Sequence, residues 1–430
     1  SPSRWPSGSV RPWRPPSARP EVPDGAAPLR AFAVEDTTVQ LTWSGLPTGE
    51  GTVGVGPCSV VVSHVPPAWV HRRGVGPRRL DPRPHGPGAA LIEGLEPETT
   101  YEVWWKPDGG RRHVVGRVRT LRPPPGEELF RFATLSDLHL GERRFGFLGL
   151  IEEVRRPSEG LPPYPVRAAE AALQEAAAWG ATTVVLKGDL TSSGRPDQFR
   201  LLASLLDRVP MGALAQLGNH DARRPPVDLA AALPGVPAAT GGRPLVVDRP
   251  GVRLVLADSP SPSDRRGHVD GAQAALIADA VSTAPTPSIV TLHHPPQRWP
   301  VPLSYPPGLV AVDRRRLLAA LARARPAPVL LAGHTHRNRT YRVGPLLVAE
   351  VGSTKDYPGG WAGYVVHEGG LRQVVRRTAR PDVLRWTEST ARALGGAWGR
   401  WSPGRLSDRC WSHPWGEKGA GGGGERVARY

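Results

Sequence analysis

The sequence predicts an α/β layered domain preceded by a smaller all-β domain. From about residue 128 onward, apolar runs of strand length alternate with segments of helical periodicity, as in a layered α/β domain. Residues 28–122 instead hold short runs of period two, broken by Gly and Pro clusters. The chain of 430 residues exceeds the usual size of one domain, which also favours two.

The first residues predict disorder followed by a β-sandwich. Residues 1–27 are rich in Pro, Ser and Arg and lack periodicity. The run Leu95-x-Pro97-x-Thr99-x-Tyr101 resembles the tyrosine corner of a fibronectin type III sandwich, whose phenol bonds back to the backbone. Trp43, in an alternating run, would be its core tryptophan. Such a module is expected to dock a protein or to orient a dimer, and another small β-sandwich is the alternative.

The catalytic part is expected over residues 128–380, after a stiff Pro-rich linker at 123–127. The expected strands are 129–135, 182–186, 213–217, 253–257, 288–292, 329–332, 346–351 and 362–367. The expected helices are 166–179, 196–209, 272–281 and 313–323. Regular patterning fades after 380, so residues 381–430 are expected to form an irregular tail rich in Arg, Gly and Trp.

The composition argues against several classes of binding partner. The formal net charge is +16, but the basic residues are scattered, which argues against a nucleic-acid surface and favours some attraction of small anions. Cys58 and Cys410 lie far apart and fit neither a disulfide framework nor a zinc spacing. There is no apolar run of about 18 residues, so no membrane span is expected. No signal segment is visible, which favours the cytoplasm.

Polar side chains follow five of the expected strands, at the point where each strand ends. The ends of neighbouring strands in an open α/β sheet meet at one edge, so these side chains should converge. Carboxylate, imidazole and amide ligands together suit Mn, Fe or Zn better than Mg or Ca. A carboxylate can also bridge two ions about 3.5–4 Å apart. The candidate ligands are Asp137, His139, Asp189, Asn219, His293, His334 and His336.

These motifs, in this order, resemble those of the calcineurin-like metallophosphoesterases. The matching residues are Asp137-x-His139, Gly188-Asp189, Gly218-Asn219-His220-Asp221, His293 and Gly333-His334-x-His336. The resemblance implies a four-layer αββα sandwich and two divalent or trivalent transition metal ions. It implies that Asp137, His139 and His336 hold one ion, that Asn219, His293 and His334 hold the other, and that Asp189 bridges them.

The resemblance also implies a mechanism. A hydroxide held by the metals would attack phosphorus, and His220 would protonate the leaving oxygen or stabilise the transition state. Asp221 would orient the His220 ring, with a helix N-cap as its alternative role. His293 and His294 compete for one ligand position, and His293 is favoured because the family places its ligand first in such a pair.

Lys355 and Asp356, after the strand expected at 346–351, are expected to form an ordinary surface turn.

Two branches of the superfamily are disfavoured. The run after Asp189 lacks the Asp-Arg of the protein phosphatases, and Ser192 stands where purple acid phosphatases carry a ligand Tyr. The chain is most similar to the bacterial class III cyclic-nucleotide phosphodiesterases and related glycerophosphodiesterases. We therefore expect a phosphodiesterase. The alternatives are a phosphomonoesterase of the same superfamily and a non-catalytic docking protein that acts through its β-sandwich.

Overall fold

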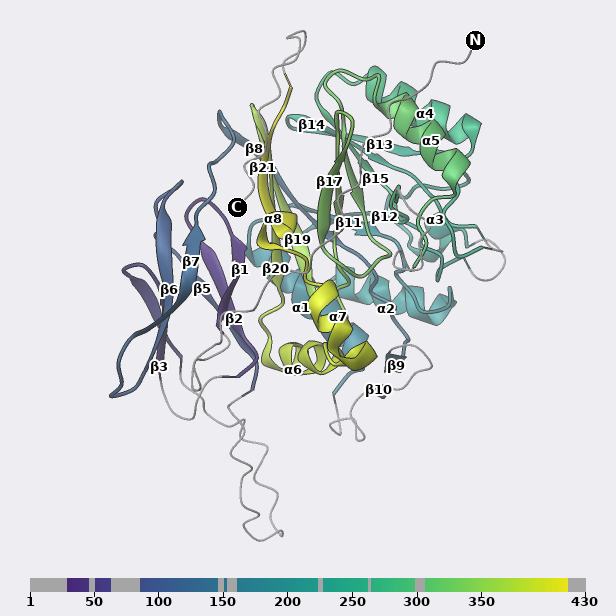
Figure 1. Ribbon diagram of the computed structural model, residues 1–430. Coiled ribbons are helices and arrows are strands. Elements are labelled where there is room, and N and C mark those ends of the chain that lie inside the picture. The colour runs from purple at the N-terminus through teal and green to yellow at the C-terminus, as the bar shows by residue number, and fades with distance from the viewer. Residues whose placement is uncertain are drawn as a thin grey trace, which may run out of the picture.

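The structure is a computed structural model that describes residues 29–45, 51–62, 86–145, 151–152, 161–222, 227–261, 264–297 and 306–416. The segment 1–27 and the Gly-rich end of the expected tail lie outside the described residues. Two parts are visible in Figure 1, a set of purple and blue N-terminal strands beside a larger α/β part. Among the helices described, none is long and apolar enough to cross a membrane.

The N-terminal part consists of two antiparallel sheets. One has the order β1-β2-β5 and the other the order β4-β3-β6-β7. These strands are β1 Arg30–Val34, β2 Val39–Trp43, β3 Gly51–Val55, β4 Cys58–Val62, β5 Gly88–Ile92, β6 Thr100–Pro107 and β7 His113–Arg119. Trp43 is buried in their common core. The amide of Glu96 donates to the Tyr101 hydroxyl at 2.9 Å. The all-β prediction is confirmed, while the fibronectin type III assignment stays a prediction.

The first sheet of the catalytic part carries three parallel strands at one side. Its order is β12-β11-β8-β19-β20-β21. The strands are β8 Glu128–Leu135, β11 Thr183–Lys187, β12 Gly212–Gln216, β19 Gly360–His367, β20 Gly370–Arg377 and β21 Cys410–Pro414. Strands β8, β11 and β12 run parallel, and β19 pairs with β8 in the antiparallel sense. The three parallel strands therefore end at the same edge.

The second sheet has four parallel strands in its middle. Its order is β13-β14-β15-β16-β18-β17. The strands are β13 Leu245–Arg249, β14 Val252–Leu256, β15 Ser288–Thr291, β16 Val329–Ala332, β17 Arg339–Val343 and β18 Leu346–Glu350. Strands β13 and β17 are antiparallel to their neighbours. A separate short pair consists of β9 Arg144–Phe145 and β10 Ile151–Glu152.

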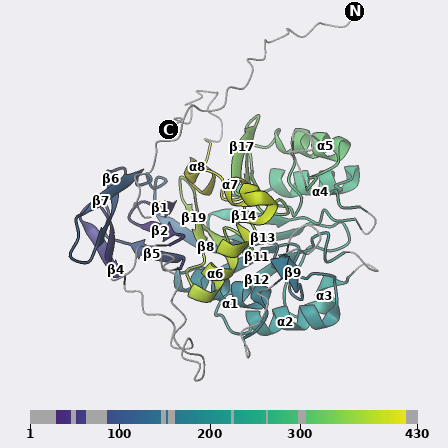
Figure 2. The ribbon, with the colours of Figure 1, turned by 60° about the horizontal axis from the view of Figure 1, so that its bottom comes forward.

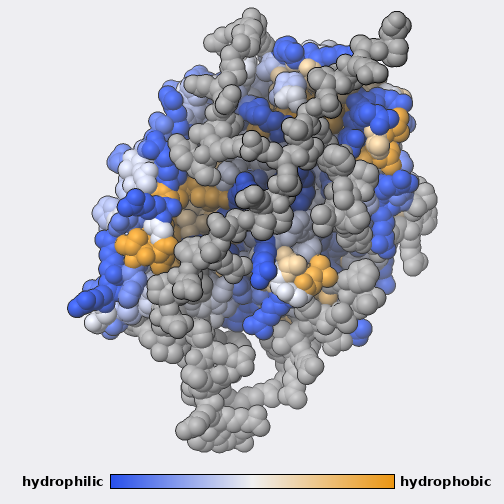
Figure 3. Space-filling view, viewed as in Figure 1, coloured by the Kyte–Doolittle hydropathy of each residue, from blue (hydrophilic) through white to orange (hydrophobic). Residues whose placement is uncertain are grey.

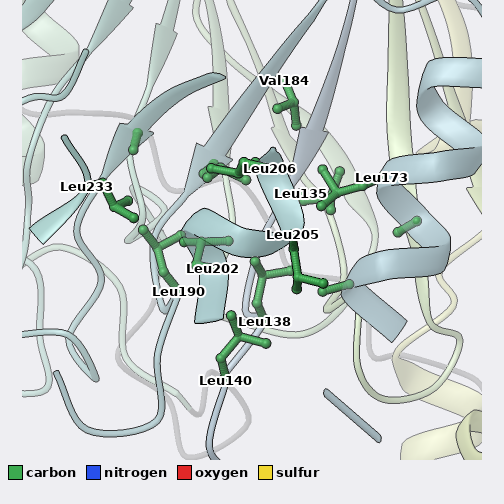
Figure 4. Close-up of a cluster of buried hydrophobic side chains, with 14 of the residues drawn as sticks. Leu135, Leu138, Leu140, Leu173, Val184, Leu190, Leu202, Leu205, Leu206 and Leu233 are labelled. Atoms are coloured by element: carbon green, nitrogen blue, oxygen red, sulfur yellow. The ribbon is translucent and has the colours of Figure 1, made fainter. Parts of the chain in front are cut away.

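The two sheets pack face to face, and helices cover their outer faces (Figures 1 and 2). The helices are α1 Tyr164–Ala178, α2 Pro196–Leu206, α3 Leu229–Ala232, α4 Gly271–Ser282 and α5 Ala311–Leu321. Helices α1, α2 and α3 pack on the first sheet, and α4 and α5 pack on the second. Figure 4 shows how leucines such as Leu135 on β8, Leu173 on α1 and Leu202 on α2 interdigitate. The α/β prediction is confirmed.

The expectation of an irregular tail from residue 381 is wrong as far as residue 416. The chain forms α6 Pro381–Thr390, a 3-10 turn η3 Ala393–Gly396, α7 Ala397–Trp401, α8 Leu406–Arg409 and β21. β21 pairs with β20 and extends the first sheet by one strand. Trp386 of α6 stacks on Tyr164 of α1, with ring centroids 3.9 Å apart. Short elements anchored by single tryptophans leave no periodic pattern, which is why the sequence hides them.

The N-terminal sheets pack on the α/β part of the same chain. Gln40 of β2 exchanges two hydrogen bonds with the backbone of Arg377, at 2.7 and 2.9 Å. The Glu35 carboxylate pairs with the buried guanidinium group of Arg372 and with the partly buried one of Arg376. Cys410 is a free, buried thiol in this interface. Docking of another protein by the sandwich stays a prediction.

On the face shown in Figure 3, the described residues form no large apolar patch. On the face in Figure 3, hydrophilic residues spread over the described surface and the hydrophobic ones form small separate areas. The exposed large hydrophobic side chains are Val114, Leu129, Leu161, Val246, Leu276, Val312 and Leu394. They belong to different elements, as is usual for scattered surface apolar residues.

Candidate metal centre

The five motifs meet between the ends of the two sheets. The loops after β8, β11 and β12 carry Asp137, His139, Asp189 and Asn219, and the loops after β15 and β16 carry His293, His334 and His336. Backbone hydrogen bonds tie the loops together. The amide of His139 donates to the carbonyl of Asp189 at 2.9 Å, and the amide of Gly333 donates to the carbonyl of His293 at 3.0 Å.

All seven candidate ligands therefore come from loops at the same edge of the sandwich.

The side chains of these loops form overlapping groups of metal-ligand type. In each group the ligand atoms lie within 4.8 Å of one another. The groups are Asp137 with His139 and His336, Asp137 with Asp189 and His293, His139 with Asp189 and His220, and His293 with His294 and His334. Asp137 and Asp189 belong to two groups each, so the groups make one continuous site.

Glycines in the motifs make room for the bridging carboxylate. A Cβ on Gly218 would lie 2.1 Å from the Asp189 amide nitrogen and 2.3 Å from Asp189 Oδ1. Gly188 has a φ of 89°, and a Cβ there would lie 2.7 Å from Nδ1 of His293. Only glycine lets the backbone approach this closely and adopt such a φ without strain. The Gly-Asp and Gly-Asn-His-Asp spacings thus follow from packing at Asp189.

Most candidate ligands have an unusual backbone conformation. In the described part of the chain, seven residues other than glycine have positive φ, and five of them are candidate ligands. These are Asp137, His139, Asp189, His334 and His336. A left-handed backbone at such residues costs about 1–3 kcal/mol each and is concentrated at functional sites. Packing of the loops thus holds these ligand side chains in positions that a relaxed turn would not give.

Hydrogen bonds fix which imidazole nitrogen faces the centre. His293 Nδ1 donates to the carbonyl of Lys187 at 2.9 Å. Its Nε2 then lies 3.2 Å from Asn219 Oδ1 and 3.4 Å from Asp189 Oδ1. His334 Nε2 donates to the carbonyl of Pro307 at 3.1 Å, which leaves Nδ1 as the nitrogen available for a metal.

Asp356 and Lys355 are buried parts of the site, so the expectation of a surface turn is wrong. The Asp356 carboxylate lies 2.7 Å from His336 Nδ1. His336 Nε2 in turn lies 3.2 Å from Asp137 Oδ1. Lys355 Nζ lies 2.6 Å from a Glu142 carboxylate oxygen and 3.5 Å from Asp356. A carboxylate behind an imidazole orients a metal ligand and raises its basicity.

Their position in the sequence could have identified these two residues. They follow the strand expected at 346–351, just as the other motifs follow the strands that precede them.

The geometry favours His293 over His294 as a ligand beside Asn219. His293 reaches both Asn219 and Asp189 through one nitrogen. His294 Nδ1 instead pairs with the Ser259 hydroxyl at 2.9 Å, and its ring is fully buried. His294 still lies within reach of His334.

His220 faces the centre, but Asp221 does not orient it. His220 Nδ1 donates to the carbonyl of Ser192 at 3.2 Å, and its Nε2 lies 4.0 Å from Asp189 Oδ2. The Asp221 carboxylate accepts from the amides of Gly218, Leu190 and Thr191 at 2.9, 3.1 and 2.8 Å, and from the Thr191 hydroxyl at 2.7 Å. The chain turns back here, since the Asp221 amide bonds to the Gly218 carbonyl, so neighbouring side chains point to opposite sides.

The predicted Asp221–His220 contact is therefore wrong. Asp221 does not cap a helix either, because it ties two of the loops together. Burial, followed by the nearby Asp189, raises the pKa of the Asp221 carboxyl to about 6.

The electrostatics of the centre call for cations. Burial by itself would lower the pKa of His293, but the Asp189 carboxylate raises it to about 9. In the same way Asp356 and Asp137 overcome burial and raise the pKa of His336 to about 10. Burial lowers the pKa of His334 to about 3, with a further contribution from His293. Two imidazoles thus carry protons beside the buried carboxylates.

The available donor atoms fit transition metal ions. His139 Nε2 is buried and lacks a hydrogen-bond partner in the part of the chain that the structure describes, and Asp137 Oδ1 is contacted only by His336 Nε2 among the printed ion pairs. Buried polar atoms in proteins rarely lack a partner, because an unpaired buried polar atom lowers the stability of the fold. A mixed set of carboxylate oxygens, imidazole nitrogens and one amide oxygen suits Mn, Fe or Zn. Placing a cation among these atoms would satisfy them and replace the two protons.

Comparison with known proteins shows what this part of the chain resembles. Residues 130–338 match the calcineurin-like phosphoesterase family. Over 176 residues the chain is 29% identical to a probable cyclic nucleotide phosphodiesterase of Rhodococcus erythropolis, covering 40% of this chain and 56% of the relative. Over 177 residues it is 30% identical to a cAMP/cGMP dual specificity phosphodiesterase of Mycobacterium tuberculosis, covering 39% and 52%.

The chain thus spans about half the length of these curated relatives. Among solved structures, a purple acid phosphatase from yellow lupin (Lupinus luteus) seeds aligns with a TM-score of 0.42 and 14% identity, covering 82% of this chain and 72% of the other.

Proposed function

We propose that the domain hydrolyses phosphodiesters with the help of two transition metal ions. The observation that carries this proposal is the convergence of seven ligand-type side chains around Asp189. In this proposal Asp137, His139 and His336 would hold one ion, Asn219, His293 and His334 would hold the other, and both ions would share the Asp189 carboxylate. When bound, such ions make water more acidic and neutralise charge on phosphoryl oxygens.

His220 is proposed as the proton donor of the reaction. Its Nδ1 proton is held by the Ser192 carbonyl, so the ring is fixed with Nε2 toward the centre. Once doubly protonated, the ring can donate the Nε2 proton to the departing alkoxide and lower the cost of its release. The Ser192 carbonyl can only accept, so Nδ1 carries a proton whether the ring is neutral or charged.

A diester, such as a cyclic nucleotide or a glycerophosphodiester, is the proposed substrate. The run after Asp189 lacks the side chains of the protein phosphatase and purple acid phosphatase branches. Two relatives carry phosphodiesterase names.

We further propose that residues 28–122 form a fibronectin type III sandwich and residues 128–380 the catalytic domain. The Tyr101–Glu96 hydrogen bond supports the first assignment.

The test compares three substrate classes on protein loaded with Mn. Cyclic nucleotides, glycerophosphodiesters and phosphomonoesters are followed by phosphorus NMR. Turnover of at least one diester, well above that of any monoester, is expected. Faster turnover of monoesters would replace the proposal by a phosphomonoesterase, and the absence of any turnover would refute an enzymatic role.

Two variants separate the roles within the centre. Asp189→Ala should lose both metal and activity, because both ions share this carboxylate. His220→Ala should keep its metal content and lose rate by about 100-fold or more. Normal turnover by His220→Ala would remove His220 from the mechanism while leaving the metal proposal intact.

A further inference from the structure

Two tryptophans near the C-terminal end of the described chain lie beside the candidate metal centre. The ring centroid of Trp398 is 6.0 Å from that of His336 and 5.3 Å from that of Trp401. We call Trp398 and Trp401 the aromatic wall. Both lie on α7, in a stretch beyond residues 130–338, so the wall is not part of the region that matches the family. In both ribbon views α7, in yellow, lies on the catalytic part of the chain (Figures 1 and 2).

The wall is tied to the loop that carries His336. The amide of Asn338, two residues after His336, donates to the carbonyl of Ser402 at 2.9 Å. The guanidinium carbon of Arg337 lies 4.8 Å from the ring centroid of Trp401. Because these contacts join α7 directly to the ligand loop, the wall keeps a fixed position relative to the centre.

Trp398 does not compete for the nitrogens of His336. These face Asp137 on one side and Asp356 on the other. The two rings meet at 66°, an edge-on contact. Phe145 supports Trp398 with a centroid distance of 6.1 Å. The indole is thus a neighbour of a ligand that packs against other rings and remains only partly exposed.

Trp398 packs against the core aromatics of the same region, but the two tryptophans of the wall are less buried than those aromatics. Tyr164 and Trp386 are stacked and almost completely buried, at 1% and 4% exposure. Trp398 and Trp401 instead remain partly exposed. An aromatic surface left open beside a phosphate site can be covered by a flat ring of the substrate, which gains apolar contact and stacking.

We propose that the aromatic wall stacks against the nucleobase of a substrate whose phosphate lies at the metal centre. This inference rests on the proposed function and narrows its substrates to nucleotide diesters. The wall begins beside a ligand ring, so a ribose can span the gap between phosphate and base. Glycerophosphodiesters have no ring to place there and would gain nothing from the wall.

The test measures equilibrium binding and needs no turnover. Two ligands are titrated calorimetrically into Mn-loaded protein, namely the 5′-methylenephosphonates of adenosine and of ribose, which cannot be hydrolysed at this position. The wild type should bind the adenosine ligand about tenfold more tightly than the ribose ligand. Trp398→Ala should reduce this ratio to less than about twofold, and Trp398→Phe should keep most of it.

Leu394→Ala is the matched control, since Leu394 lies in the same segment and is 68% exposed. It should retain the wild-type ratio. A general loss of structure would weaken both ligands alike and leave the ratio unchanged. The inference is overturned if the wild type shows no preference, or if Trp398→Ala keeps it. If neither phosphonate binds, the inference fails, while the proposed function is decided separately by the turnover of diesters.

Discussion

Protons occupy two imidazoles of the centre at neutral pH. The raised pKa values of about 9 for His293 and about 10 for His336 mean that both rings are charged at pH 7 without metal. A metal ion must displace a proton to bind such a nitrogen, so affinity should fall as the pH falls below these values. For each proton displaced, Mn affinity should rise about tenfold per pH unit between pH 7 and 9.

Calorimetry in buffers of different ionisation enthalpy measures this directly. Binding of two ions should release about two protons. Identical heats in all buffers would show that the rings are already neutral and that their carboxylate neighbours do not hold protons there.

Asp356 is expected to strengthen metal binding through His336. Its carboxylate lies behind His336, and Asp356→Asn removes the negative charge while keeping the size of the side chain. Metal affinity should fall about 10–100-fold, as for other partners of ligand imidazoles. Asp270→Asn is the control, because it removes only the carboxylate cap of α4. If both variants bind Mn equally well, Asp356 is merely structural.

At the residue scale, the sequence predicts the candidate metal ligands better than it predicts the groups that hydrogen-bond to them. Each candidate ligand follows an apolar strand, so its position is visible in the pattern. The carbonyl of Ser192 and the carboxylate of Asp356 act through contacts that form only when separate loops meet. Asp221 follows His220 directly in the sequence, but the two side chains do not meet. The turn closed by the bond between the Asp221 amide and the Gly218 carbonyl points the Asp221 side chain away from His220.

The loop after β12 leaves no room for a side chain at Gly218. A Cβ on Gly218 would collide with the backbone of Asp189, which cannot move aside as a flexible side chain can. Gly218→Ala should therefore displace Asp189, reduce Mn content and diester turnover by at least about tenfold, and lower stability by about 1–3 kcal/mol. Metal analysis and urea unfolding measure the two effects.

Gly212→Ala is the matched control at the start of the same strand, where the added Cβ would meet only the Thr182 carbonyl at 3.9 Å. It should keep normal metal content and turnover. Wild-type metal content in Gly218→Ala would show that the loop has room to rearrange and that the close approach is not required.

The elements with strong periodicity could be predicted, and the short ones could not. The apolar strands β8, β11, β15 and β16 and the amphipathic α2 lie within a few residues of their expected positions. α6, α7 and β21 were missed because each is held by one or two tryptophans or by strand pairing rather than by a repeating apolar face.

For the molecule as a whole, a buried ionic contact joins the β-sandwich to the catalytic domain. Glu35 is 5% exposed and pairs with Arg372 and Arg376. Glu35→Gln would remove the carboxylate that pairs with Arg376 and one of the two that pair with Arg372, Asp36 being the other, so the free energy of unfolding should fall by about 1–3 kcal/mol. Glu93→Gln, on the exposed surface, should change it by less than about 0.5 kcal/mol.

Urea unfolding of both variants measures the difference. Equal stability would mean that the docking does not depend on this contact. Docking of the two domains could not be read from the sequence, because Glu35, Gln40 and the arginines of β20 look like ordinary surface residues until the two sheets meet.

The central claim is that one centre of two metal ions carries diester hydrolysis. The most direct measurement is the rate of bis(p-nitrophenyl) phosphate hydrolysis as a function of Mn bound per chain. The structure predicts negligible turnover without metal and a rate that rises until two ions are bound. Full turnover by metal-free protein, or none at any loading, would contradict it.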